Sequence, residues 1–466
     1  MTQQIHVSNS QAAVLDELGA EFGERSGNVL LREAEQVTDY QRDMAALPDP
    51  HLPLAVVLAE SVEDVQVTLR WASKHRVSIV PRGAGTGVSG AAHAIQDCVV
   101  LSLERMNRIL EIRPDDEVAV VEPGVVNAGL NAAVAEFGLM YAPDPASFQQ
   151  STIGGNIATN AGGLRCAKYG VTRDSVLGLT IVLADGSIIE TGKQTFKGVA
   201  GYDLTSLVIG SEGTLGIVVK ATVRLRYLSK NQRAFAAIFD DIETAAEGVL
   251  AIGRARVQPA ILELLDDGVM AVIDSIHGTH LKGTGGALLI GLTDGFGAFL
   301  EEDVIRETLT NLGGTMFVKD DPQAKALLDM RRVSRGDEQD DAFRVGEDVA
   351  VPKSKMVEYI RELHRIADRN NVWVRTVAHA GDGNLHPTFW IDPSEGHDGV
   401  ARLDAALDDS IRAALAIGGT ITGEHGVGQY KLRWLGWEQS EQVRELQHHI
   451  KALFDPQGIL NPNKAI

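Results

Sequence analysis

Two histidines on either side of a turn signal are the residues of this sequence best placed to do chemistry together. His379 and His386 flank Asp382–Gly383 in the stretch VAHAGDGNLHP. An Asp-Gly pair is typical of a two-residue β-hairpin turn. With that turn, residue 379 pairs with residue 386, and the two Cβ atoms lie about 5 Å apart on one face. Such a pair either packs across two strands or binds one divalent ion.

A second short motif, TGEHGVG, places a carboxylate next to another histidine. Glu424 would add the anionic ligand that turns two histidines into an open metal site. His425 lies in the same glycine-flanked loop and can act as a general base near neutral pH. The sequence therefore suggests a metal at His379, His386 and Glu424, with zinc as the first choice and manganese or iron as alternatives.

The loop PRGAGTGVSGAA, Pro81–Ala92, is rich in glycine and follows an apolar run. Its backbone N–H groups can close on a flat, anionic ligand such as a nucleotide pyrophosphate. The loop lacks the lysine of a triphosphate-binding loop. Gly85–Gly90 matches G-x-G-x-x-G, but too few residues precede the next strand at Val99 for the crossover helix of a nicotinamide-binding fold. A solvent-facing loop is the remaining alternative.

Three later segments are also rich in small residues. They are Pro143–Gly163, Lys168–Gly170 and Gly201–Val218, and the first has no charged side chain after Asp144. Backbone groups and neutral amides in such segments can pack against a polar, planar ligand. Together with the first loop, these segments suggest one extended ligand bound along a single domain.

Composition excludes several classes of function. The 466 residues suggest two or three domains, and 44% hydrophobic and 23% charged residues are typical of a soluble protein. The net charge of −20 disfavours nucleic acid and anionic membranes as partners. Two cysteines, Cys98 and Cys166, suit a reducing compartment and exclude a Cys-ligated cluster. Without a transmembrane run or signal peptide, we expect a cytoplasmic protein.

Periodicity predicts an α+β fold. Helices are expected after the N-cap residue Ser61 and over Asn127–Phe137. Strands are expected over Leu54–Ala59, Val77–Val80, Val99–Leu103, Ile109–Ile112, Val118–Val121, Gly178–Leu183, Val372–Ala378 and Leu385–Ile391.

The order of these motifs, with FDPQGILNPNK at the C-terminus, resembles the FAD-dependent oxidoreductases of the vanillyl-alcohol oxidase/p-cresol methylhydroxylase superfamily. The most similar branch contains D-lactate dehydrogenases, the glycolate oxidase flavin subunit and D-2-hydroxyglutarate dehydrogenase. The resemblance implies a two-subdomain FAD-binding domain over 1–228. It also implies a cap domain with a large antiparallel sheet over 229–410 and a segment over 411–466 that returns to the flavin.

The same resemblance implies roles for individual residues. Because the first loop has no histidine before His93, FAD should be non-covalent. Residues expected to hold FAD are Pro81, Arg82, Gly83, Ala84, Gly85, Thr86, Gly87, Ser89, Gly90, Asp144, Pro145, Ser151, Thr152, Gly155, Asn156, Thr159, Gly162, Glu212, Gly213, Ile217, Val218 and Asn461. Of these, Glu212, Gly213, Ile217 and Val218 should meet the adenosine side, and Asn461 the isoalloxazine. His379, His386 and Glu424 should bind the metal, with His425 as the base.

These parts suggest that a D-2-hydroxy acid, first of all D-lactate, is oxidised to a 2-oxo acid with hydride transfer to the flavin. Arg331 is the first candidate to bind the substrate carboxylate, Arg332 is the alternative, and Lys353 and Asn384 are further candidates. Two other readings are a flavin subunit of a glycolate oxidase assembly and an aromatic-alcohol oxidase that needs no metal. Quinone, cytochrome, an electron-transfer flavoprotein or oxygen could accept the electrons. A homodimer and attachment at the inner face of the membrane stay open.

Overall fold

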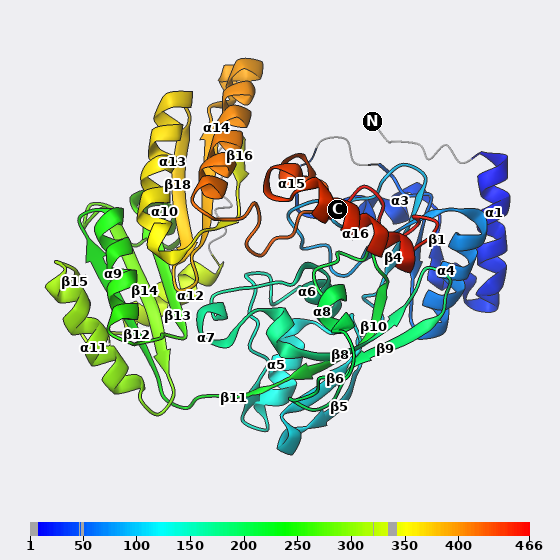
Figure 1. Cartoon of the computed structure of the whole chain (residues 1–466), viewed down its shortest axis with the longest axis horizontal. Helices are drawn as coiled ribbons and strands as arrows, with labels where there is room; N and C mark the ends of the chain where they lie inside the picture. The colour runs from blue at the N-terminus through cyan, green and yellow to red at the C-terminus, as the bar shows by residue number, and fades with distance from the viewer. Residues whose placement is uncertain (1–7, 46, 48–50, 320, 334–342) are drawn as a thin grey trace. The chain divides into compact units, whose positions relative to one another are not determined.

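The computed structural model describes residues 8–45, 47, 51–319, 321–333 and 343–466 (Figure 1). The chain forms two compact units. The first unit comprises Met1–Ala161, Val171–Leu228 and Glu424–Ile466, and the second comprises Gly162–Gly170 and Ser229–Gly423. Helix α14 (Gly396–Ala416) runs through residue 410, the expected end of the cap domain, and the second unit continues to Gly423.

The first unit contains a four-stranded sheet in the order β1-β2-β4-β3, in which β2 and β3 both run parallel to β4. Helix α4 connects β2 to β3 and begins with the expected cap: Ser61 Oγ accepts from Asp64 N at 3.2 Å, and Asp64 Oδ2 accepts from Ser61 N at 3.1 Å. The bounds are β1 Leu30–Leu31, β2 Ala55–Leu58, α4 Val62–His75, β3 Ser78–Arg82 and β4 Cys98–Ser102.

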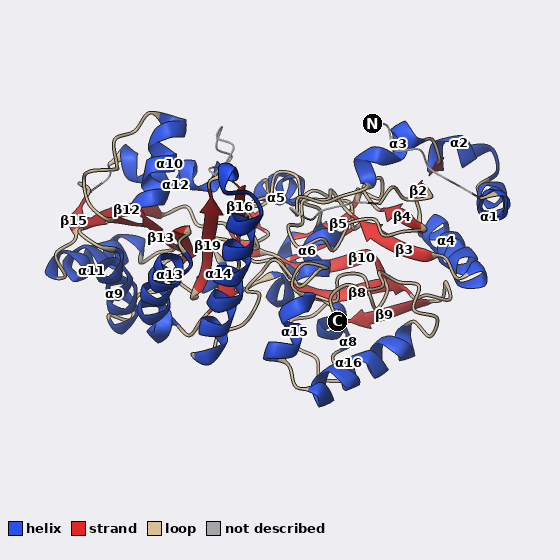
Figure 2. Cartoon of the chain, turned by 90° about the horizontal axis from the view of Figure 1, so that it is seen from above, coloured by secondary structure: helices blue, strands red, loops and turns tan. Residues whose placement is uncertain are grey.

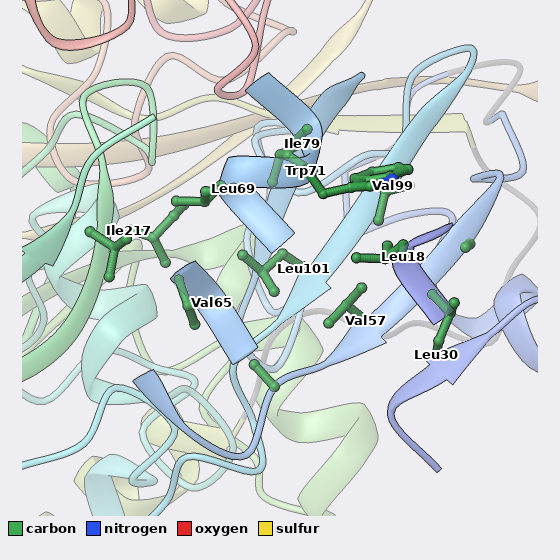
Figure 3. Packing of buried hydrophobic residues seen from close by; sticks show 14 of the residues in the cluster. Leu18, Leu30, Val57, Val65, Leu69, Trp71, Ile79, Val99, Leu101 and Ile217 are labelled. Atoms are coloured by element: carbon green, nitrogen blue, oxygen red, sulfur yellow. The ribbon is translucent and has the colours of Figure 1, made fainter. Parts of the chain in front are cut away.

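Figure 3 shows how this sheet is buried. Val57, Ile79 and Val99 from its three parallel strands pack with Leu69 of α4. Ile217 belongs to the same apolar cluster, which therefore continues to strand β10 of a second sheet. Burial of this apolar area stabilises the sheet from which the glycine-rich loop leaves.

The connection from β3 to β4 is a coil with no helix in it. This confirms the prediction that G-x-G-x-x-G does not here begin a nicotinamide-binding βαβ unit. Strand β3 extends further than expected, because Pro81 and Arg82 continue the parallel ladder opposite Leu101 and Ser102. The loop proper therefore begins at Gly83.

The second sheet of the first unit is antiparallel, in the order β5-β6-β10-β8-β9. Helices α5 and α6 and the strands β7 and β11 lie beside it, and the C-terminal segment returns to the parallel sheet through a bridge between Ile79 and Leu460. The bounds are β5 Ile109–Arg113, β6 Val118–Val121, α5 Asn127–Ala135, β7 Leu139–Met140, α6 Ile153–Thr159, β8 Val176–Val182, β9 Ile188–Gly192, α8 Leu204–Val208, β10 Ile217–Arg224, β11 Arg226–Tyr227, α15 Leu432–Glu438 and α16 Glu441–Phe454.

The second unit is built on one large antiparallel sheet, in the order β15-β12-β14-β13-β18-β19-β16, with β17 also paired to β19. Helices α9, α11 and α13 cover one face and α10 and α12 the other (Figure 2). The bounds are β12 Gln232–Phe239, α9 Ile242–Arg254, β13 Ile261–Asp266, α10 Asp267–His277, β14 Ala287–Asp294, α11 Ala298–Asn311, β15 Thr315–Met316, α12 Pro322–Val333, β16 Phe343–Gly346, β17 Val349–Ala350, α13 Met356–Asn370, β18 Trp373–His379 and β19 Asn384–Ile391.

Successive side chains of a strand point to opposite faces of the sheet, so the packing of one residue identifies its face. Ile261, Leu265 and Ile290 share an apolar cluster with Leu327 of α12, so they mark the face covered by α10 and α12. Helix α7 (Cys166–Tyr169) belongs to this unit and is held by Asp294, whose carboxylate accepts from Lys168 Nζ and Tyr169 Oη at 2.5 and 2.6 Å. The α+β class with a large antiparallel sheet is confirmed.

The N-terminal part of the first unit contains three helices: α1 Asn9–Glu21, α2 Ser26–Val29 and α3 Ala34–Val37. Within the described ranges, no helix combines the length and apolar character needed to cross a membrane.

Candidate functional site

The histidine hairpin has a different register from the predicted one. His379 pairs with Asn384, and His386 lies opposite Val377. The prediction of a two-residue turn at Asp382–Gly383 was therefore wrong. The turn has four residues, because the N–H groups of Asp382 and Gly383 both donate to His379 O, at 3.3 and 3.2 Å.

The two imidazoles nevertheless lie together, as expected. The register is shifted by two residues, and a shift of two keeps every side chain on its face of the sheet. The ring centroids of His379 and His386 are 5.1 Å apart, with an edge-to-face angle of 81°. The pair lies on the face that α10 and α12 cover, because Val377, between the two histidines, packs against that apolar cluster.

A buried carboxylate holds the first histidine. Glu263 lies opposite His379 in the β13–β18 ladder, and its Oε1 is 2.7 Å from His379 Nδ1. A carboxylate can only accept a hydrogen bond, so Nδ1 carries the proton and Nε2 keeps its lone pair for a ligand. The Glu263 side chain has no exposed area, and its second oxygen, Oε2, pairs with the Arg331 guanidinium at 3.1 Å.

A second buried carboxylate lies beside the other histidine. Asp348 Oδ1 is 3.9 Å from His386 Nδ1, and the Asp348 side chain is fully buried. Its other oxygen accepts from Thr422 Oγ1 at 2.8 Å and from Gly423 N at 2.9 Å. A Cβ on Gly423 would come within 2.2 Å of Asn384 Oδ1, so only glycine fits there. Asp348 thus holds Thr422 and Gly423, the last residues of the second unit, and also lies beside His386.

The predicted substrate-binding residues of the second unit differ in surroundings. Arg331 is 8% exposed and bound to Glu263, and Asn384 is 7% exposed beside His379. Asn384 Oδ1 is buried and has no hydrogen-bond partner among the described residues. Lys353 is exposed. The side chain of Arg332, the alternative to Arg331, lies outside the described residues.

In the first unit, the predicted cofactor segments contact one another. A Cβ on Gly83 would lie 2.4 Å from Thr152 Oγ1, and one on Gly213 would lie 2.3 Å from Pro81 Cγ. Thr152 is the N-cap of α6, accepting from Gly155 N at 3.2 Å. These distances show that the glycine loop packs directly against two segments that lie far away in the sequence.

The remaining predicted cofactor residues are distributed as follows. Asp144, Ser151 and Asn156 are buried at or before α6, and Ile217 and Val218 begin β10. Gly162 differs, because it is the first residue of the segment that belongs to the second unit. Arg82 is the last residue of β3. The others lie on the loop after β3 or around α6, as the sequence suggested: Ala84, Gly85, Thr86, Gly87, Ser89, Gly90, Pro145, Gly155 and Thr159.

Asn461 joins three of these segments. Its Nδ2 donates to Ala91 O at 3.0 Å and to Glu212 O at 2.7 Å. Lys464, which is 1% exposed, donates from Nζ to the carbonyls of Ala91 and His93. Burial lowers the pKa of Lys464 to about 8 and raises that of Glu212 to about 7.

These residues suit a bound FAD. The oxygens Ser151 Oγ and Asn461 Oδ1 are buried and make no hydrogen bond to any residue within the described ranges. A buried polar atom without a partner costs about 1–3 kcal/mol unless a ligand or water satisfies it. They lie on segments rich in glycine and small side chains, where a long, planar, polar cofactor can approach the backbone closely.

Glu424 and His425 begin the last segment of the first unit. Glu424 Oε1 is 3.9 Å from His425 Nε2, and both side chains are partly exposed. Ser89 Oγ donates to His425 O at 3.2 Å, so the proposed base is tied to the glycine-rich loop.

Three residues were missed at the sequence level. Glu263 had a signal, because it is a single charge inside the buried strand ILELLD. Asp348 and Lys464 had none, since each follows other charged or polar residues in a loop. Their importance comes from contacts with distant parts of the chain.

Family models match both halves of the chain: "FAD binding domain" over residues 53–192 and "FAD linked oxidases, C-terminal domain" over residues 228–465. The chain is 40% identical over 418 residues to the glycolate oxidase subunit GlcD of Bacillus subtilis, covering 89% of each. It is 34% identical over 413 residues to a D-lactate dehydrogenase of Archaeoglobus fulgidus, covering 88% of this chain and 91% of that one.

Among solved structures, p-cresol methylhydroxylase with substrate bound superposes with a TM-score of 0.79 at 18% identity, covering 99% of this chain and 98% of that one. At that identity the likeness establishes the fold. The two family matches together span most of the sequence and agree with the fold. The chain belongs to the FAD-linked oxidases and is an FAD-dependent oxidoreductase.

Proposed function

We propose that this protein is a dehydrogenase that oxidises a D-2-hydroxy acid to the 2-oxo acid, with D-lactate as the first substrate to test. The observation that carries the proposal is the pair of neighbouring imidazoles of His379 and His386, with the buried Glu263 bound to Nδ1 of His379 at 2.7 Å. The names of the relatives, a glycolate oxidase subunit and a D-lactate dehydrogenase, support a small hydroxy acid as substrate.

Two histidines and one carboxylate would hold a divalent metal, with zinc as the first choice. The histidines are His379 and His386. The carboxylate is Glu424, which directly follows Gly423, the residue whose N–H binds Asp348. A bound divalent ion supplies a Lewis acid that lowers the pKa of a coordinated hydroxyl. Glu263 and Asp348 would orient the histidines, as carboxylates next to metal-binding histidines do.

Bound FAD supplies the acceptor for the two electrons that leave the substrate. The chain's own residues bind the substrate and move the proton. Arg331 and Asn384 would position the substrate carboxylate, and His425 would take the hydroxyl proton at its imidazole. The pairing of Arg331 with Glu263 keeps its guanidinium on the face of the sheet that carries the histidines.

The test is anaerobic reduction of the purified yellow protein with D-lactate, L-lactate, glycolate and D-2-hydroxyglutarate. The wild type should lose its flavin colour with the D-acids. The His425→Ala variant should retain FAD, measured by its visible absorbance, but should no longer be reduced. Normal reduction of this variant would contradict the role of His425 as the base.

A flavin subunit that needs partners is the second candidate, since a relative 40% identical is named a subunit. Turnover of the single chain with D-lactate and a dye acceptor would exclude that candidate. An aromatic-alcohol oxidase would keep full activity after treatment with a chelator. The proposed dehydrogenase should lose activity with the metal and regain it when zinc or manganese is added.

A further inference from the structure

Both carboxylate oxygens of Glu212, in the first unit, accept hydrogen bonds from backbone N–H groups. Its side chain is buried, with the residue 4% exposed. Oε1 accepts from Val427 N at 2.7 Å, and Oε2 accepts from Gly428 N at 2.8 Å. These N–H groups come from the loop that begins with Glu424 and His425. Both oxygens therefore point at the backbone that carries the proposed base.

The loop is shaped to wrap around this carboxylate. Gly426 has φ of +80°, and a Cβ there would lie 2.8 Å from Glu212 Oε1. Ser89 fixes the same loop on both sides of that turn: its Oγ donates to His425 O at 3.2 Å, and its carbonyl accepts from Gln429 N at 2.9 Å. The loop that carries His425 is thus held by two separate segments of the first unit, those of Ser89 and Glu212.

Glu212 is itself held in place through its backbone. Its N–H donates to Ala158 O of α6 at 2.8 Å, and its carbonyl accepts from Asn461 Nδ2 at 2.7 Å. The residue has φ of +51°, a conformation that needs support for a side chain larger than glycine. The position of the carboxylate is therefore set by the proposed cofactor segments.

We propose that Glu212 is a positioning residue that holds the His425 loop in register with the FAD-binding segments. The effect of Glu212 on catalysis rests on the proposed function, because it requires His425 to be the base. The hold of Glu212 on the loop does not depend on the proposed function. A glutamine at 212 has one acceptor oxygen and presents an NH₂ group to the second N–H, so one of the two backbone bonds is lost.

The test compares Glu212→Gln with Glu122→Gln. Glu122 is also 4% exposed in the first unit, and it accepts from Arg108 N at 2.8 Å, away from the His425 loop. FAD content, hydrogen exchange of the peptide containing residues 424–431, and kcat and KM for D-lactate are measured for both. The variant that combines Glu212→Gln with His425→Ala completes a double-mutant cycle.

The proposal expects faster exchange of the Val427 and Gly428 amides in Glu212→Gln, with FAD retained. It also expects kcat to fall about 10- to 100-fold with KM little changed, as a misplaced catalytic group does, and no further loss when His425→Ala is already present. Unchanged exchange, or loss of FAD as the main effect, would overturn the positioning role. If His425→Ala alone leaves flavin reduction intact, the proposed base fails, whereas the exchange result still decides the role of Glu212.

Discussion

The two units build their candidate sites from different kinds of groups. In the first unit, the segments around Gly83, Thr152 and Asn461 offer mainly backbone amides, hydroxyls and neutral side chains, and the buried charges of Glu212 and Lys464 bond backbone groups. In the second, charged side chains are buried against one another on a sheet, as with Glu263 and His379. Neutral small residues allow close approach of a long ligand, whereas a set of buried charges demands partners at fixed distances. Damage to one unit should therefore impair FAD binding, and damage to the other metal binding.

The largest expected effect comes from removing a histidine of the second unit. His379→Ala should lower the rate of flavin reduction about 10³-fold, because loss of a bound metal removes several kcal/mol of transition-state stabilisation. FAD content should not change. His397→Ala, on the exposed start of α14, is the control. If His379→Ala lost FAD to the same extent as it lost flavin reduction, the FAD site and the metal site would not be separable.

Glu263→Gln should weaken metal binding without removing a ligand. The loss of an orienting carboxylate next to a metal-binding histidine costs about 10- to 100-fold in affinity. Competition with a coloured zinc chelator measures this. Glu302→Gln is a matched control, because Glu302 is 1% exposed in the same unit and bonds Arg306 Nε at 2.8 Å instead. Equal affinities in the two variants would contradict the orienting role.

Gly83→Ala should affect the first unit instead. The added Cβ would lie 2.4 Å from Thr152 Oγ1, and moving that oxygen breaks the cap of α6. We expect FAD affinity to fall about tenfold, from a cost of about 1–3 kcal/mol for overpacking. Gly129→Ala is the control, because nothing lies within 4 Å of its added Cβ. Fluorescence quenching of added FAD measures both, and metal affinity should stay constant.

The last expected effect concerns stability and not activity: a pH dependence in the second unit. Burial raises the pKa of Asp266 from 3.8 to about 7, against hydrogen bonds from Val269 and Thr376 that lower it. Between these values the folded protein keeps a proton that the unfolded chain has released, so stability falls as pH rises. The slope for one proton is at most about 1.4 kcal/mol per pH unit.

Asp266→Asn should remove this contribution. Denaturant unfolding at pH 5 and pH 7 would compare the variant with the wild type and with the exposed control Asp368→Asn. A flatter dependence in Asp266→Asn is expected, because an amide does not titrate in this range. If the slopes of all three proteins agree, Asp266 does not exchange its proton on unfolding.

Local sequence patterns correctly predicted much of the fold and part of the candidate site. The capping box at Ser61 and the apolar runs of β2, β4 and β6 have the predicted type and nearly the predicted bounds. The short span after Gly90 correctly excluded a crossover helix. The histidines of β18 and β19 were placed on one face, although the turn between them was misjudged. A period of two residues survives a register error of two.

What the sequence by itself determined is therefore the class of each surface: small and neutral in the first unit, with two histidines on one strand face in the second. The tertiary structure alone decided the partners. Glu263 binds His379 across 116 residues, and Glu212 binds Val427 across 215 residues. Periodicity and composition report on neighbours along the chain. Strand order and the return of the C-terminal segment bring distant charges together, and those depend on how the whole unit packs.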